Sequence, residues 1–132
     1  MHCFVYGTLT DESTASRLLD AYEFRGSATL VGLHRVDGQY PTLAPGGSVD
    51  GRSLTTTESE SLDRYEGVDN GLYVRLSVPA DGGLPADRVD VYVGDPDRLD
   101  APVTWPGDGS FATRVRAFLR EHDVRVVRDE RS

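Results

Sequence analysis

One glutamate, Glu66, stands at the end of a short predicted helix and is a candidate acid or base. It follows Leu62 by four residues, so it shares the edge of the helix face that should pack inward. It also lies in the last turn, where the helix dipole disfavours another negative charge. Both effects raise the pKa of a carboxyl group toward neutrality, as general acid–base catalysis requires. A solvated glutamate paired with an arginine fits the same spacing equally well.

The second candidate is the turn within "FVYGTLT", residues 4–10. Phe4-Val5-Tyr6 is typical of a strand end, Gly7 of a sharp bend, and Thr10 of the residue that caps a following helix. Backbone N–H groups that point outward from such a turn, together with the helix dipole, can bind a carboxylate or a phosphate. Many turns of this kind only redirect the chain, so this pattern alone leaves the role of the turn open.

Other kinds of site find little support in the sequence. His2, His34 and His122 are far apart and match no metal-ligand spacing, and no serine stands in a G-x-S-x-G context. The glycine-rich segment "APGGSVDG", residues 44–51, lacks the lysine and the helix of a phosphate-binding loop, so we interpret it as a tight turn. Cys3, the single cysteine, is expected to be a buried apolar side chain. We therefore expect neither a metal nor a cofactor.

The composition restricts the partners. The 132 residues include 14 arginines, no lysine and 22 acidic residues, for a net charge of −8. Without lysine there is no Schiff-base or lysine-base chemistry, and the negative charge disfavours nucleic acid and anionic membranes. Both a salt-adapted cytoplasm and a GC-rich codon bias explain this balance. No apolar run approaches the roughly 18 residues of a membrane span, so we expect a cytoplasmic location.

The hydrophobic patterns predict one domain over residues 1–123 and a C-terminal tail over residues 124–132. The strands are expected at 2–6, 27–36, 39–45, 48–56, 72–78 and 88–94, and the helices at 11–22, 59–66 and 110–122. Gly67 is suited to the left-handed position after the second helix. This mixture predicts an α+β fold with a small mixed or antiparallel, barrel-like sheet and about three helices.

Several short motifs resemble one known family, the γ-glutamylcyclotransferase-like (AIG2-like) proteins. The segment "YGTL", residues 6–9, resembles the amino-terminal Y-G-S-L signature of that family, with Thr8 in place of the usual serine. The segment "LDRYEGVDNGLY", residues 62–73, resembles the part of the family that carries the catalytic glutamate. The motifs "YPTL" (40–43) and "DVYV" (90–93) follow in the family's usual order, so the likeness covers roughly residues 1–95.

The resemblance implies a compact α+β fold with a cavity at the mouth of a small barrel. The backbone of Tyr6, Gly7, Thr8 and Leu9 would hold the α-amino-acid end of a γ-glutamyl group, and Glu66 would be the general acid and base. Tyr73 would line the pocket and could donate a hydrogen bond there, although packing in the barrel is an equally good explanation. Tyr40 and Tyr92 would be further substrate-binding residues.

The implied reaction is an intramolecular cyclisation that releases 5-oxoproline and a free amine or amino acid from a γ-glutamyl substrate. The leaving group stays open, as does the oligomeric state. Two other functions are compatible with the sequence: a non-catalytic module that binds a small metabolite in the same fold, and a structural barrel without a pocket. A position of Glu66 close to Gly7 would favour the enzyme or the binding module over the structural barrel.

Overall fold

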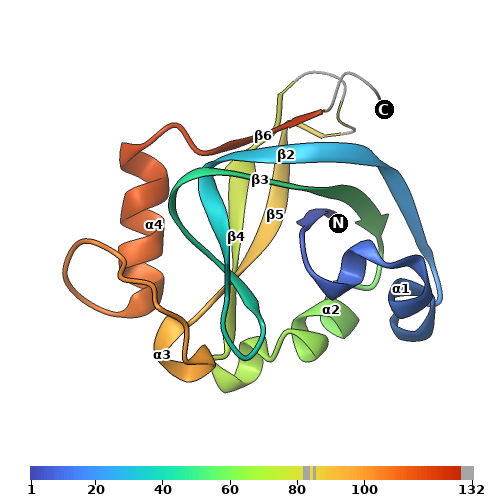
Figure 1. Ribbon diagram of the computed structural model, residues 1–132. Helices are drawn as coiled ribbons and strands as arrows, with labels where there is room; N and C mark the ends of the chain where they lie inside the picture. The colour runs from blue at the N-terminus through green and yellow to red at the C-terminus, as the bar shows by residue number, and fades with distance from the viewer. Residues whose placement is uncertain (82–83, 85, 129–132) are drawn as a thin grey trace.

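A computed structural model describes residues 1–81, 84 and 86–128, apart from the side chain of Thr8. Its centre is one curled sheet of six strands in the order β4-β5-β1-β3-β2-β6 (Figure 1). The strands are β1 (His2–Val5), β2 (Tyr22–Asp37), β3 (Pro41–Thr56), β4 (Tyr73–Pro79), β5 (Arg88–Gly94) and β6 (Arg125–Arg128). Neighbouring strands are antiparallel except β1 and β5, which are parallel. A bridge between Ala80 and Val126 brings the two ends of the sheet together.

The helices lie around this sheet, as Figure 1 shows. They are α1 (Glu12–Leu18), α2 (Ser59–Tyr65), α3 (Pro96–Leu99) and α4 (Phe111–Glu121), with two short 3-10 helices, η1 (Thr8–Thr10) and η2 (Val68–Asn70). The expected α+β class with a mixed, barrel-like sheet is confirmed. None of the helices in the described part of the chain is both long and apolar enough to cross a membrane.

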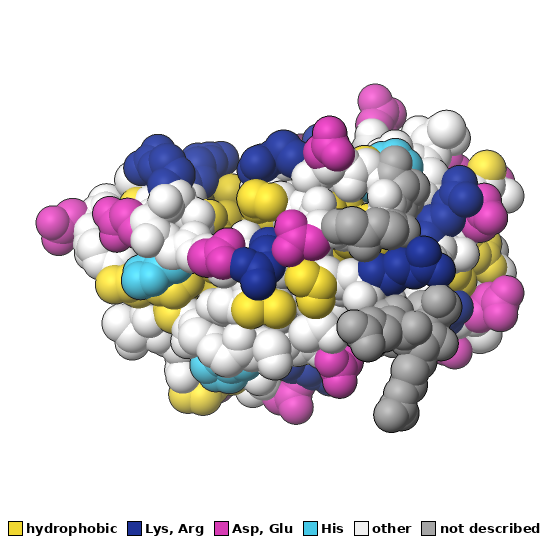
Figure 2. All heavy atoms as spheres, turned by 90° about the horizontal axis from the view of Figure 1, so that it is seen from above, with side chains coloured by type: hydrophobic (Ala, Val, Ile, Leu, Met, Phe, Trp, Pro, Cys, Tyr) yellow, Lys and Arg dark blue, Asp and Glu magenta, His cyan; other side chains and the backbone are white. Residues whose placement is uncertain are grey.

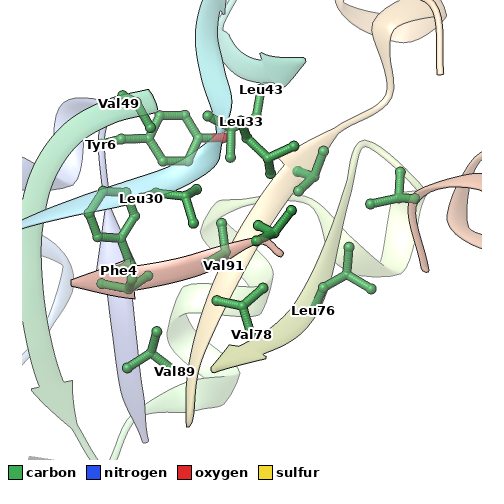
Figure 3. Packing of buried hydrophobic residues seen from close by; sticks show 14 of the residues in the cluster. Phe4, Tyr6, Leu30, Leu33, Leu43, Val49, Leu76, Val78, Val89 and Val91 are labelled. Carbon is green, nitrogen blue, oxygen red and sulfur yellow. The ribbon is translucent and has the colours of Figure 1, made fainter. Parts of the chain in front are cut away.

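Strand β1 is central to the fold because both of its faces are buried. Phe4 belongs to the larger core cluster inside the curl of the sheet, whereas Cys3 and Val5 belong to a second cluster on the opposite face. This division follows from the two-residue period of a strand. Figure 3 shows the larger cluster, in which side chains from β1 to β5 converge. The prediction of a buried Cys3 is confirmed.

Some predicted boundaries are wrong. The first helix ends at Leu18 rather than residue 22, because Tyr22 pairs with Thr56 at the start of β2. Its cap is Asp11, which accepts a hydrogen bond from the N–H of Thr14, and not Thr10. The short helix α3 had no counterpart in the expected elements.

The glycine-rich segment 44–51 is not a tight turn. It belongs to β3, which pairs with β2 as one long hairpin. Gly46 and Gly47 take positive φ angles of 93° and 73°, opposite a register shift between Val31 and Leu33. The two strands therefore bend together at this bulge, and the chain reverses only after Asp37.

The end of the chain also differs from the expectation. Residues 125–128 of the predicted tail form β6, in which Ala28 pairs with Arg128 and Leu30 with Val126. Val126 is fully buried. Burial of alternate residues against β2 stabilises this segment as a strand. The rest of the predicted tail, residues 129–132, lies outside the described residues.

Candidate active site

A cavity of about 360 Å³ lies where the turn after β1 meets the end of α2. Its walls come from both core clusters and from the segments around them: Phe4, Val5, Tyr6, Gly7, Leu9, Tyr40, Pro41, Tyr65, Glu66, Leu72, Tyr73 and Tyr92. Among these described residues, Glu66 carries the only carboxylate and none carries a positive charge. The cavity is thus an aromatic enclosure around one carboxyl group.

The turn after β1 is held in place by its carbonyl groups. The carbonyl of Gly7 accepts hydrogen bonds from both the N–H and the hydroxyl of Thr10, at 3.1 and 2.7 Å. Arg35 donates to the carbonyl of Tyr6 at 3.2 Å, and Arg52 donates to that of Thr10 at 3.0 Å. These bonds fix the turn from the carbonyl side. No hydrogen bond between described residues uses the N–H of Gly7 or of Leu9.

Glu66 is the residue that terminates α2. Its N–H donates to the carbonyl of Leu62 at 2.9 Å, and Gly67 then takes the left-handed conformation with a φ of 66°. Leu62 is fully buried, so α2 lies with this edge against the core, as the spacing predicted. Burial raises the pKa of the Glu66 carboxyl group from its ordinary value of 4.5 to about 7. Glu66 therefore exchanges a proton readily near neutral pH.

Three tyrosine hydroxyl groups around the cavity are already engaged as donors. Tyr6 donates to the carbonyl of Tyr92 at 2.6 Å, and Tyr92 donates to the carboxylate of Asp63 at 2.7 Å. Tyr73 donates to the carbonyl of Pro41. Burial raises the pKa of each of these hydroxyl groups, so each keeps its proton. Because Tyr73 donates its proton to Pro41, its hydroxyl oxygen is left with only the capacity to accept a hydrogen bond, and it is not free to act as the expected donor.

Two charged residues that the sequence did not indicate support this arrangement. Asp63, one turn before Glu66 on α2, accepts the hydrogen bond from Tyr92 and pairs with Arg75 of β4 at 3.1 Å. These contacts fasten α2 to the sheet and so position Glu66. The spacing of Asp63 and Glu66 on one helix was visible in the sequence, but the partners of Asp63 come from strands that only the fold brings near.

The structure brings most of the predicted site residues to one place. Seven of the eight line the cavity, namely Tyr6, Gly7, Leu9, Tyr40, Glu66, Tyr73 and Tyr92. Thr8 lies in η1 between Gly7 and Leu9. Tyr40 lies at the rim of the cavity, with 58% of its surface exposed. Tyr65, which the sequence did not indicate, also lies at the rim, with 44% of its surface exposed. Among the described residues no cluster of three or more His, Cys, Asp or Glu side chains suits a metal ion.

The arrangement of the turn and the glutamate can be compared with known proteins. A family profile described as gamma-glutamyl cyclotransferase, AIG2-like, matches residues 3–110. The chain belongs to this family. The matched segment contains the turn after β1, Glu66 and all the tyrosines of the cavity. Comparison with curated proteins gives no match.

Solved structures share the fold of this family member. A gamma-glutamyl cyclotransferase is similar over 92% of this chain and 98% of its own, with 17% identity and a TM-score of 0.61. An uncharacterized protein from Homo sapiens covers 89% of this chain and 96% of its own, with 16% identity and a TM-score of 0.62. A protein from Arabidopsis thaliana is 27% identical over 91% of this chain and 83% of its own, with a TM-score of 0.54.

Proposed function

We propose that the protein is a γ-glutamylcyclotransferase-type enzyme that releases 5-oxoproline and a free amine or amino acid from a γ-glutamyl substrate. The observation that carries the proposal is the shared cavity of Glu66 and the turn at Gly7. The carboxyl group has a pKa of about 7 there, which suits a group that must first accept and then return a proton. Membership of the family and the similarity to a gamma-glutamyl cyclotransferase structure support the same reaction.

The reaction needs only the substrate and one proton carrier. The α-ammonium group of the substrate loses a proton to the Glu66 carboxylate, and the free amine attacks the γ-carbonyl carbon. A C–N bond forms and closes the five-membered lactam. The bond from this carbon to the original amide nitrogen then breaks, and that nitrogen takes the proton from Glu66. The ring nitrogen still carries two hydrogens, so the Glu66 carboxylate removes one of them and passes it to the released amine, which leaves as an ammonium group. The atoms balance without water or an external nucleophile.

The turn would hold the substrate in the folded conformation that this attack requires. The N–H groups of Gly7 and Leu9 have no acceptor among the described residues, so they can donate to the α-carboxylate of the glutamyl group. The oxygen of Tyr73 can accept a hydrogen bond from the α-ammonium group, since its own proton is donated to Pro41. Fixing both ends of a short flexible chain lowers the entropic part of the barrier.

The Glu66→Gln variant tests the proposal. It keeps the shape of the side chain and removes the proton carrier, so we expect release of 5-oxoproline from γ-glutamyl-alanine to fall about 10³-fold while ligand binding is kept. Glu60→Gln on the exposed side of the same helix is the matched control and should retain wild-type turnover. Wild-type turnover by Glu66→Gln would exclude Glu66 as the base.

A substrate panel separates the enzyme from a metabolite-binding module with the same fold. The panel contains γ-glutamyl amino acids, γ-glutamyl peptides and γ-glutamyl amines without a carboxylate in the leaving group. We expect 5-oxoproline from at least one of them. Tight binding of one compound without 5-oxoproline from any would contradict the enzymatic proposal and support the module.

A further inference from the structure

A second hollow, of about 330 Å³, lies between β4 and α4, away from the cavity that contains Glu66. We call it the arginine groove. Its apolar lining residues are Leu76, Val78, Pro79, Leu119 and Val124, and Ser77 lies among them. Its basic lining residues are Arg75, Arg88, Arg116 and Arg120. Among its described lining residues none is acidic. The groove therefore combines an apolar surface with four guanidinium groups.

Two of these arginines come from α4. Val115 and Phe118 bury one face of this helix in the core, which leaves Arg116 and Arg120 exposed one turn apart. Neither arginine forms an ion pair or a hydrogen bond with any described residue. Their charges are available to a ligand.

The other two arginines are anchored on the sheet. Arg88 donates to the hydroxyl and to the carbonyl of Ser77, at 2.7 and 2.9 Å, and forms no ion pair with a described residue. These neutral acceptors fix its side chain without cancelling its charge. Arg75 differs, because it pairs with Asp63 at 3.1 Å and lies 4.0 Å from Asp90. Three uncompensated guanidinium charges thus border one groove.

Such a cluster is unexpected in this chain. With 22 acidic residues against 14 arginines, a carboxylate partner is abundant for any arginine. In the surface view of Figure 2, several basic side chains lie next to one another along the upper left border, with an acidic side chain at the right end of the row. Like charges that lie close together repel one another, so their grouping around a hollow points to an anionic ligand.

We propose that the arginine groove binds a compact organic phosphate. A phosphate ester carries a charge close to −2 at neutral pH and presents three acceptor oxygens, which matches several converging guanidinium groups. The apolar residues of the groove would contact the organic part of the ligand, and about 330 Å³ suits a small molecule. A longer acidic polymer would extend beyond the groove and be repelled by a protein whose net charge is −8. A compact anion instead keeps its whole charge within about one Debye length of the arginines.

The test is a calorimetric titration with phenyl phosphate at low and at physiological ionic strength. We expect saturable binding that weakens with salt. The double variant Arg116→Gln and Arg120→Gln should weaken it at least about tenfold, because each lost guanidinium removes a charge-assisted hydrogen bond. The matched control is Arg17→Gln with Arg98→Gln, which removes the same charge from exposed positions on α1 and α3 and should leave binding unchanged.

Two further arms test the chemistry of the ligand. Inorganic phosphate should bind more weakly than phenyl phosphate, because it makes no contact with the apolar residues. Equal affinity of the two would contradict the organic part of the proposal, and tighter binding of hexaglutamate would contradict the compact anion. The proposal is overturned if phenyl phosphate shows no saturable binding. It is also overturned if the control variant at Arg17 and Arg98 weakens the binding of phenyl phosphate as much as the variant at Arg116 and Arg120 does. None of these results depends on release of 5-oxoproline.

Discussion

The two hollows of this protein have opposite chemistry although β4 and its neighbours border both. The cavity near Gly7 has aromatic walls and one carboxyl group, and none of its described lining residues is basic. The arginine groove has four guanidinium groups, and none of its described lining residues is acidic. The two kinds of charge are thus found in different hollows. A carboxyl group is desolvated in the cavity near Gly7, and arginines without carboxylate partners border the arginine groove.

One ion pair connects the two regions. Arg75 lines the groove and pairs with Asp63, and Asp63 accepts the hydrogen bond of Tyr92, which lines the cavity. Asp63 is also one turn before Glu66 on α2. An anion that takes Arg75 would therefore compete with a contact that positions α2. The following variants test how independent the cavity and the groove are.

The largest effect is expected for Gly94→Ala. The added Cβ would overlap the buried side chain of Leu99 and lie 2.9 Å from the ring of Tyr73, which its hydrogen bond to Pro41 holds in place. Overpacking of this kind should lower the free energy of unfolding by about 3 kcal/mol. Gly7→Ala is the control, because its Cβ would be 3.7 Å from Pro41 at the nearest.

Urea unfolding measures both glycine variants, and a titration with phenyl phosphate shows whether the groove survives. We expect Gly94→Ala to lose turnover while its folded fraction still binds the phosphate. Equal stability of Gly94→Ala and the wild type would contradict the close packing between β5 and Tyr73.

The second effect concerns the stability of Glu66→Gln as a function of pH. Because burial raises the pKa of Glu66 from 4.5 to about 7, the unfolded chain loses this proton before the folded chain does. The wild type therefore loses stability as the pH rises through this window, whereas the uncharged glutamine does not. We expect the variant to be about 3 kcal/mol more stable than the wild type above pH 7 and equal to it near pH 4.

Urea unfolding at several pH values checks this expectation, with Glu60→Gln as the exposed control. If the difference between Glu66→Gln and the wild type does not change with pH, Glu66 is not desolvated in the folded protein. Loss of activity in a variant that gains stability would separate the catalytic contribution of Glu66 from its contribution to folding.

A smaller effect is expected for Asp63→Asn. Asparagine still accepts the hydrogen bond from Tyr92, but it no longer carries the charge that pairs with Arg75. Because this pair is partly exposed, its loss should cost less than about 1 kcal/mol of stability. The released arginine should bind phenyl phosphate about threefold more tightly, which the same titration measures. Unchanged affinity would show that the groove does not use Arg75.

The smallest effect is expected for Tyr40→Ala at the rim of the cavity. With 58% of its surface exposed, Tyr40 contributes little to the core, so the free energy of unfolding should change by less than about 0.5 kcal/mol. If the leaving group contacts this ring, KM should rise about threefold with kcat nearly unchanged. An unchanged KM for every substrate in the panel would place the leaving group elsewhere.

Short-range patterns predicted a large part of the fold. The helix over 110–122 is observed as Phe111–Glu121, and Gly67 takes the left-handed position after α2, because both depend on residues within one or two turns. The local pattern gave a wrong prediction where a residue forms its hydrogen bonds with a partner that is distant along the chain. Tyr22 continued an apolar helix stripe but pairs with Thr56, and Gly46-Gly47 had the composition of a turn but lies within a long hairpin.

The sequence by itself determined the ingredients of the candidate site: one glutamate at a helix end, a glycine turn after the first strand, and several tyrosines in a chain without lysine. Only the tertiary structure decided that Glu66 and Gly7 share a cavity, that Tyr73 donates to Pro41, and that three arginines border a groove without carboxylate partners. The reason is physical. Side-chain type and local spacing are encoded within a few residues, whereas burial, pKa and ion pairing depend on residues that only strand pairing brings together.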